Sequence, residues 1–133
     1  MIALGFSIAA ILILARAAQH DWKTRTCPNE FWVLLLIPGA YHVGLTGSMA
    51  AWVVGLAVGG TMWLAGSGGA DAKAVMAAGL LFTDPFLYAG LVLCSHAGAL
   101  PLLLLRDGRG APFLVPLAVS LSTGLLMGFL WPS

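Results

Sequence analysis

The chain has 133 residues, of which 60% are hydrophobic and 8% are charged, and its formal net charge is +1. A protein surrounded by water usually carries about 25% charged residues, so this composition excludes an ordinary water-facing enzyme, a disordered chain and a nucleic-acid binder, which would need a basic patch. The apolar runs are continuous, and an α-helix satisfies its own backbone hydrogen bonds in lipid. The composition therefore predicts an all-α, polytopic membrane protein with a single domain over residues 1–133.

Six apolar segments follow one another along the chain, and each is predicted to form a transmembrane helix, because about 20 apolar residues cross a bilayer. The segments cover residues 2–18, 31–45, 49–65, 72–82, 85–105 and 111–131. The short fourth segment rises only roughly 16 Å, too little for about 30 Å of hydrocarbon. We therefore expect the glycine-rich residues 66–69 to dip inward before it, or the bilayer to be thinner there.

The basic residues predict how these helices are oriented. All of them fall in the first, third and fifth connections between segments, and they are Arg16, Lys23, Arg25, Lys73, Arg106 and Arg109. Loops rich in lysine and arginine stay on the cytoplasmic side of a membrane. This distribution therefore predicts six transmembrane helices with both termini outside, in a multi-pass protein of the cell membrane.

Two dipeptides predict where helices begin. Asp84 before Pro85 is typical of an N-cap followed by proline at the first helical position. In the same way, Asn29 after Pro28 predicts a cap for the second segment. Glu30 then lies in the first turn of that helix, where the helix macrodipole favours an anion.

Small residues recur every four positions in the third and fourth segments. They are Ala51, Gly55 and Gly59 in the third segment, and Ala70, Ala74 and Ala78 in the fourth. Residues with this spacing share one face of a helix. Because they carry little or no side chain, they predict a close approach of helix backbones.

Asp21 and Asp71 are the acidic residues that caps, turns and helix dipoles do not explain, and the predicted topology places both on the inner face. Two structural explanations stay open, since Asp21 could pair with Lys23 or Arg25, and Asp71 could cap the fourth segment. The glycine-rich stretch before Asp71 favours a site, because a residue without a Cβ lets a substrate backbone lie close. Two carboxylates at one site share a proton, so that one activates a water and the other polarises a peptide carbonyl. This is the chemistry of an aspartic protease, and it needs no cofactor.

The sequence around Asp21 resembles the first motif of the type IV prepilin peptidase family, which includes the archaeal preflagellin peptidases. In that pattern an aspartate follows the first helix, then come basic residues, a Pro-Asn pair and an aromatic residue. Here the stretch reads DWKTRTCPNEFW, from Asp21 through Pro28 and Asn29 to Trp32. The second motif of the family, a glycine run before Asp-x-Lys, is similar to GGADAK from Gly68 to Lys73.

A weaker third feature of the resemblance is the run PFLVP at residues 112–116, at the start of the last segment. The order of the three features matches the family over nearly the whole chain. Ala70 departs from the family pattern, which has glycine immediately before the second aspartate; the Gly-Gly-Ala-Asp form resembles the archaeal version. Larger bacterial relatives also methylate the new N-terminus and carry an insert with cysteine pairs. This chain has no such insert, so methyltransferase activity is not predicted.

The resemblance implies a membrane aspartic endopeptidase of the GxGD class, with Asp21 and Asp71 as the catalytic pair. It implies that the enzyme removes a short basic leader from prepilin-like precursor proteins on the cytoplasmic side of the membrane, with no metal and no cofactor. The implied partners are this precursor and the lipid bilayer, and the oligomeric state stays open. The residues implied to bind substrate or to support the site are Pro28, Asn29, Gly68, Gly69, Ala70 and Lys73.

Other functions stay open as alternatives. A small transporter or proton-relay membrane protein would use Asp21 and Asp71 as exchangeable carboxylates, but it would need a polar path across the bilayer, and the outer halves of the segments are nearly all apolar. An inactive scaffold in a pilus assembly machine is a third reading. A metal site that adds His20 to the two carboxylates lacks the spacing of metal ligands.

Three further side chains near these motifs have competing interpretations. Lys73 could tune the two carboxylates or contact substrate, or it could extend its charge to the membrane interface. His96, within the fifth segment, is interpreted as a polar contact between helices. Cys27 precedes a proline and has no histidine nearby in sequence, so it is not placed as an activated nucleophile.

Overall fold

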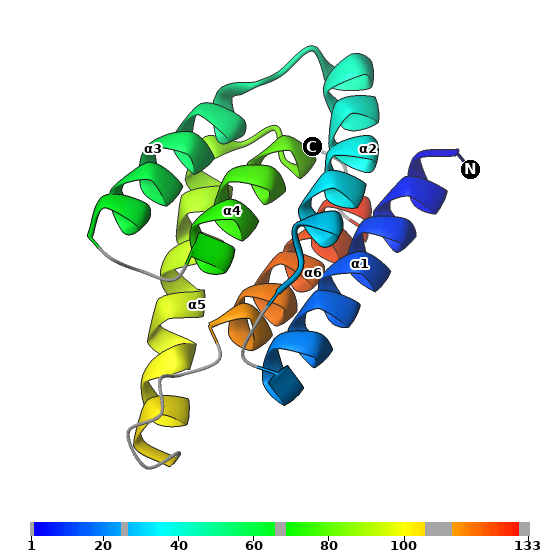
Figure 1. Cartoon of the computed structure of the whole chain (residues 1–133). Helices are drawn as coiled ribbons and strands as arrows, with labels where there is room; N and C mark the ends of the chain where they lie inside the picture. The colour runs from blue at the N-terminus through cyan, green and yellow to red at the C-terminus, as the bar shows by residue number, and fades with distance from the viewer. Residues whose placement is uncertain (1, 25–26, 66–68, 106–112, 131–133) are drawn as a thin grey trace.

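The structure is a computed structural model that describes residues 2–24, 27–65, 69–105 and 113–130 (Figure 1). All of the regular structure in these ranges is helical. The elements are α1 (Ile2–Thr24), α2 (Asn29–Thr46), α3 (Ala50–Leu64), α4 (Gly69–Ala78), the short 3₁₀ helix η1 (Gly79–Leu81), α5 (Pro85–Leu105) and α6 (Leu114–Leu130). The all-α prediction is confirmed, and each predicted apolar segment corresponds to one α-helix.

The membrane-spanning part of the fold prediction is wrong. Over the described ranges, none of the helices combines the length and the apolarity that a bilayer crossing requires. The helices α3 and α4 have 15 and 10 residues and rise only about 22 and 15 Å, and the C-terminal part of the longer α1 carries Arg16, Asp21 and Lys23. This finding overturns the predicted six transmembrane helices with both termini outside. It also overturns the predicted multi-pass location in the cell membrane with the active site facing the cytoplasm.

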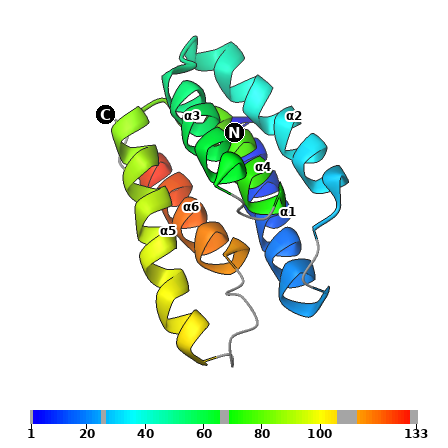
Figure 2. The ribbon, with the colours of Figure 1, turned by 60° about the vertical axis from the view of Figure 1, so that its left-hand side comes forward.

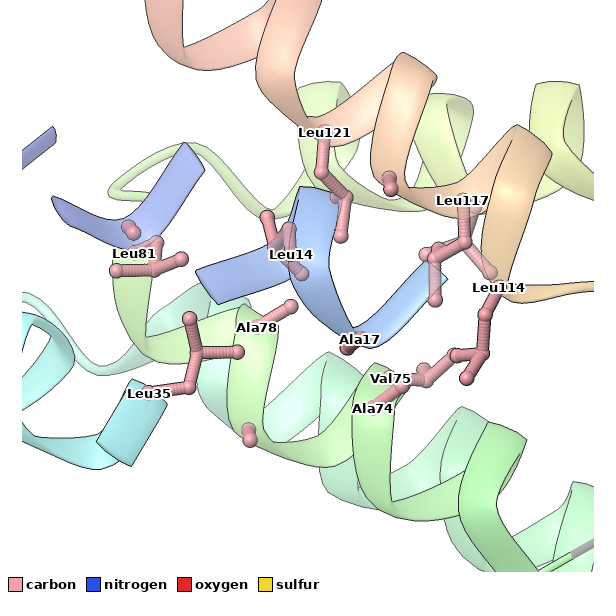
Figure 3. Packing of buried hydrophobic residues seen from close by; sticks show 14 of the residues in the cluster. Leu14, Ala17, Leu35, Ala74, Val75, Ala78, Leu81, Leu114, Leu117 and Leu121 are labelled. Carbon is pink, nitrogen blue, oxygen red and sulfur yellow. The ribbon is translucent and has the colours of Figure 1, made fainter. Parts of the chain in front are cut away.

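The helix α4 lies in the middle of the bundle (Figure 1, Figure 2). It packs along α3 and also contacts α2 and the start of α6, while α5 packs along α6, and α1 contacts both α2 and α6. Figure 3 shows how the core joins these elements: Leu14 of α1 lies between Leu121 of α6 and Ala78 of α4, and Ala17 of α1 lies next to Val75 of α4. Because α4 contacts α2, α3 and α6, several helices determine its position and so the position of the residues at its start.

The predicted close approach of helix backbones is confirmed between α3 and α4. A Cβ added at Gly59 would lie 2.7 Å from the carbonyl oxygen of Ala72, and one added at Gly55 would lie 2.9 Å from that of Val75. A real Cβ does not come so close to a backbone oxygen, so glycine is required at both positions for this packing. The small-residue face of α3 therefore fixes the position of the first turns of α4.

The predicted cap of α5 is also confirmed. One carboxylate oxygen of Asp84, Oδ1, accepts hydrogen bonds from the backbone N–H groups of Phe86, at 2.8 Å, and Leu87, at 3.1 Å. These bonds satisfy N–H groups that have no partner inside the helix. Asp84 therefore has a structural role at the start of α5.

Candidate functional site

The two aspartates selected from the sequence come from different helices. Asp21 lies near the end of α1, and Asp71 lies in the first turn of α4. Since α4 begins at Gly69, Asp71 is inside the helix and does not occupy its N-cap position. The helix α1 ends, and α2 and α4 begin, toward the same end of the bundle (Figure 1).

The carboxylates of Asp21 and Asp71 are close enough to interact electrostatically. Asp21 is buried, with 8% of its surface exposed, and Asp71 is partly buried. Burial, followed by the negative charge of Asp21, raises the pKa of Asp71 from 3.8 to about 6, while His96 acts in the opposite direction. At neutral pH Asp71 is therefore within reach of both its protonated and its ionised form, as acid–base catalysis requires.

The thiol of Cys27 is within electrostatic range of the two carboxylates. Burial raises the pKa of Cys27 to about 11, and the charges of Asp21 and Asp71 add to this effect. The thiol is therefore protonated at neutral pH, which agrees with the sequence-based interpretation that Cys27 is not an activated nucleophile.

The second residue of the Pro28-Asn29 pair contacts the second motif directly. The Lys73 ammonium group donates a hydrogen bond from Nζ to Asn29 Oδ1 over 2.8 Å. The predicted capping role of Asn29 is wrong, because Pro28 occupies the N-cap position of α2 and no side-chain cap bond is present there. Asn29 instead links the start of α2 to Lys73 of α4, which follows Asp71 by two residues.

The small residues before Asp71 have different surroundings. Gly68 lies outside the described residues. Gly69 is exposed, and a Cβ added there would meet no atom within 4 Å, so the space next to it is open. Ala70, at the position where the family pattern has glycine, is partly buried and packs against the core.

The sequence gives no indication that His96 belongs to this region. It was interpreted as a polar helix contact because no carboxylate is near it in sequence. The structure brings this α5 side chain within electrostatic range of Asp71. Only the packing of α5 against the rest of the bundle creates this proximity, so no local pattern could have indicated it.

A cavity of about 240 Å³ lies at the other end of the bundle, with Tyr41, His42 and Asp84 in its lining. Burial lowers the pKa of His42, which favours its neutral form. We place the candidate site at Asp21 and Asp71 instead, because two interacting carboxylates provide acid–base chemistry, whereas Asp84 in the cavity wall caps α5. Among the side chains that the structure describes, no group of three His, Cys, Asp or Glu residues is arranged to hold a metal ion.

No protein-family model matches the chain, and no curated protein or solved structure matches it either. Its function is therefore inferred from its own side chains and from the resemblance of its two motifs.

Proposed function

We propose that this chain is an aspartic endopeptidase in which Asp21 and Asp71 form the catalytic pair. The observation that carries the proposal is the electrostatic interaction between these two carboxylates, which come from α1 and α4 and which both raise the pKa of Cys27. Two interacting carboxylates, of which one can be protonated while the other is ionised, are what general acid–base hydrolysis of a peptide needs.

The two carboxylates have different roles in this mechanism. The protonated Asp71 donates a hydrogen bond to the carbonyl oxygen of the scissile peptide, since its raised pKa of about 6 keeps the acid form accessible. Asp21 removes a proton from a water molecule, whose oxygen attacks the carbonyl carbon. The C–N bond then breaks, and the leaving nitrogen takes up a proton, so that an amine and a carboxylic acid are released.

The proposed substrate is the short basic leader of a prepilin-like precursor. Its support is the resemblance of the two motifs around Asp21 and Asp71.

Co-expression of the chain with a prepilin-like precursor tests the proposal. We expect the wild-type chain to shorten the precursor, with the new N-terminus identified by intact mass. Asp21→Asn and Asp71→Asn should each lower the rate at least about 100-fold, because neither amide can carry the proton that the reaction moves.

Asp84→Asn is the matched control, because it removes a carboxylate at the opposite end of the bundle. Its cleavage rate should stay within about twofold of the wild type, since asparagine caps a helix about as well as aspartate. The proposal is wrong if either Asp21→Asn or Asp71→Asn cleaves at the wild-type rate, or if the wild-type chain leaves the precursor intact.

A further inference from the structure

The cavity at the other end of the bundle is bounded by two contacts between α2 and the chain around η1. At one of them, a Cβ added at Gly39 of α2 would lie 2.7 Å from the Leu80 side chain of η1, so the two elements touch there. At the other, the Ser48 hydroxyl group, just after α2, donates a hydrogen bond to the backbone carbonyl oxygen of Thr83 over 3.2 Å. Most lining residues of these two segments lie between the two contacts along the chain. The contacts therefore fix two walls of the cavity.

The helices α1 and α6 supply two further walls. The start of α1 and the end of α2 lie at this end of the bundle (Figure 1). The Phe6 ring of α1 stacks on the Tyr41 ring of α2, with their centroids 3.9 Å apart and their planes inclined by 17°. From α6 come Gly124 and Leu125. The cavity is thus built by packing between helices that are distant in sequence.

The cavity has a buried floor and an exposed mouth. Leu81 and Phe82, which line it, are buried in the core, whereas the lining residues Leu45 and Leu87 are exposed. Asp84 is the charged residue of the lining, and it is exposed too. A small molecule can therefore reach the buried part of the cavity from solvent.

One polar atom in this cavity wall has no partner. Nε2 of His42 is buried, and none of the residues that the structure describes forms a hydrogen bond with it. Burial lowers the pKa of His42, so the ring is neutral, and each nitrogen of a neutral imidazole either donates or accepts, depending on the tautomer. A buried polar atom without a hydrogen bond is unfavourable. A hydroxyl group both donates and accepts, so it satisfies Nε2 in either tautomer.

The size and the lining of the cavity restrict the ligand further. Its volume of about 240 Å³ exceeds the roughly 150 Å³ that hold benzene, and it is below the roughly 300 Å³ at which pockets for drug-sized molecules begin. The rings of Phe6, Tyr41 and Phe82 belong to the lining, and aromatic rings pack favourably on one another. Burying a charge against an apolar lining is costly, and the Asp84 carboxylate also repels an anion. The cavity therefore fits one uncharged aromatic ring with small substituents.

We propose that this cavity binds a small uncharged phenol, whose hydroxyl group forms a hydrogen bond with Nε2 of His42 and whose ring packs against the aromatic lining. The site is separate from Asp21 and Asp71, so the inference does not rest on the proposed peptidase function.

Titration of the full chain with 4-methylphenol tests the inference, with NMR signals of the His42 ring and of the backbone amides of Phe82 and Leu125 as the readout. We expect saturable shifts of these signals, with a Kd on the order of 1 mM or below. Toluene differs from this probe by lacking the hydroxyl group, and it should bind at least about 10-fold more weakly because Nε2 stays unpaired. Benzoate, an anion of similar size, should leave the signals unchanged.

Three variants locate the site. His42→Leu should weaken the binding of 4-methylphenol at least about 10-fold but keep that of toluene within about threefold, because only the hydrogen bond is removed. Ser7→Leu adds volume to the lining and should weaken the binding of both probes. His96→Leu is the matched control, since His96 is exposed and is not part of the lining, and it should change neither affinity. Circular dichroism establishes which variants are folded, and Ser7→Leu tests the site if His42→Leu does not fold.

The inference is overturned if about 10 mM 4-methylphenol leaves the three signals unchanged, which would mean that water alone satisfies Nε2. It is also overturned if 4-methylphenol and toluene bind equally well, or if a folded His42→Leu chain binds 4-methylphenol as tightly as the wild type. Shifts that persist unchanged in Ser7→Leu would assign the binding to the exposed apolar surface and would equally contradict the proposal.

Discussion

The hydrogen bond between Lys73 and Asn29 joins the two sequence motifs at the scale of single residues. Both side chains are exposed, and the bond links the start of α2 to α4 near Asp71. We predict that Lys73→Met and Asn29→Ala each lower the free energy of unfolding by less than about 1 kcal/mol, because water competes for an exposed hydrogen bond. Urea unfolding measures both changes.

A double-mutant cycle separates this bond from other effects of the two substitutions. Lys73→Met combined with Asn29→Ala should lose little more stability than one single variant, because the same bond is removed in each. Lys23→Met combined with Asn29→Ala is the control, and its two effects should add. Additive losses for the Lys73 and Asn29 pair would show that the bond contributes nothing.

The roles of single residues differed in how well the sequence predicted them. The cap formed by Asp84 depends only on the next three residues, so a local pattern was sufficient. Asn29 has a similar local pattern, but a lysine from another helix occupies its side-chain oxygen. The effect of His96 on Asp71 depends on the place of α5 in the bundle, where it packs on α6 and α3, and no local sequence pattern encodes that placement.

At the scale of elements, the packing of α3 on α4 controls the position of the site. A Cβ at position 59 would lie 2.7 Å from the carbonyl oxygen of Ala72, the residue after Asp71, whereas a Cβ at position 60 would meet no atom within 4 Å. We predict that Gly59→Ala destabilises the fold and lowers activity, since the backbone at the start of α4 must move. Gly60→Ala should stabilise the chain by about 0.5–1 kcal/mol through helix propensity.

The pair of glycine variants is informative because both changes add one methyl group to the same helix. Thermal unfolding and the rate of precursor cleavage measure the two effects. Equal stability of the Gly59→Ala and Gly60→Ala chains would contradict the close contact between α3 and α4.

The helices themselves could be predicted from apolar segments, but their ends could not. The first segment was expected to stop at residue 18, where the apolar run ends, whereas α1 continues to Thr24. Polar residues do not by themselves terminate a helix, and the stretch from Gln19 to Thr24 contains neither of the two strongest helix breakers, proline and glycine. Asp21 therefore lies on a helix, although the apolar pattern predicts it in a connection between helices.

At the scale of the whole molecule, the apolar composition led to the prediction of membrane-spanning helices. The continuous apolar segments were predicted to face lipid, yet many of them pack on one another around α4 through alanine and glycine. Large apolar side chains also lie on the outer surface, such as Leu64 and Phe86, which are 82% and 86% exposed. Hydropathy shows how much apolar surface a chain carries, but it does not show which part of that surface is buried between its own helices.

The raised pKa of Asp71 predicts how the stability of the whole chain depends on pH. Between its ordinary value of 3.8 and about 6, the folded chain holds a proton that the unfolded chain releases. Stability contributed by the protonated carboxyl is therefore fully present below about pH 4 and falls as pH rises toward 6, because the burial of a charge then opposes folding. Well above pH 6 the protonated carboxyl no longer contributes to the free energy of unfolding.

Asp71→Asn should remove this pH-dependent loss, because an amide has no charge to bury. At pH 7 we expect this variant to be more stable than the wild-type chain by on the order of 1–2 kcal/mol, a value reduced from the full shift because Asp71 is only partly buried. At pH 4 the advantage should disappear, since both side chains are then neutral. Urea unfolding of the two chains at both pH values measures the difference, and a wild-type chain that is the more stable one at pH 7 would contradict the prediction. If Asp71 is catalytic as proposed, the same substitution should abolish cleavage, and the fold would then retain this carboxylate at a cost to its own stability.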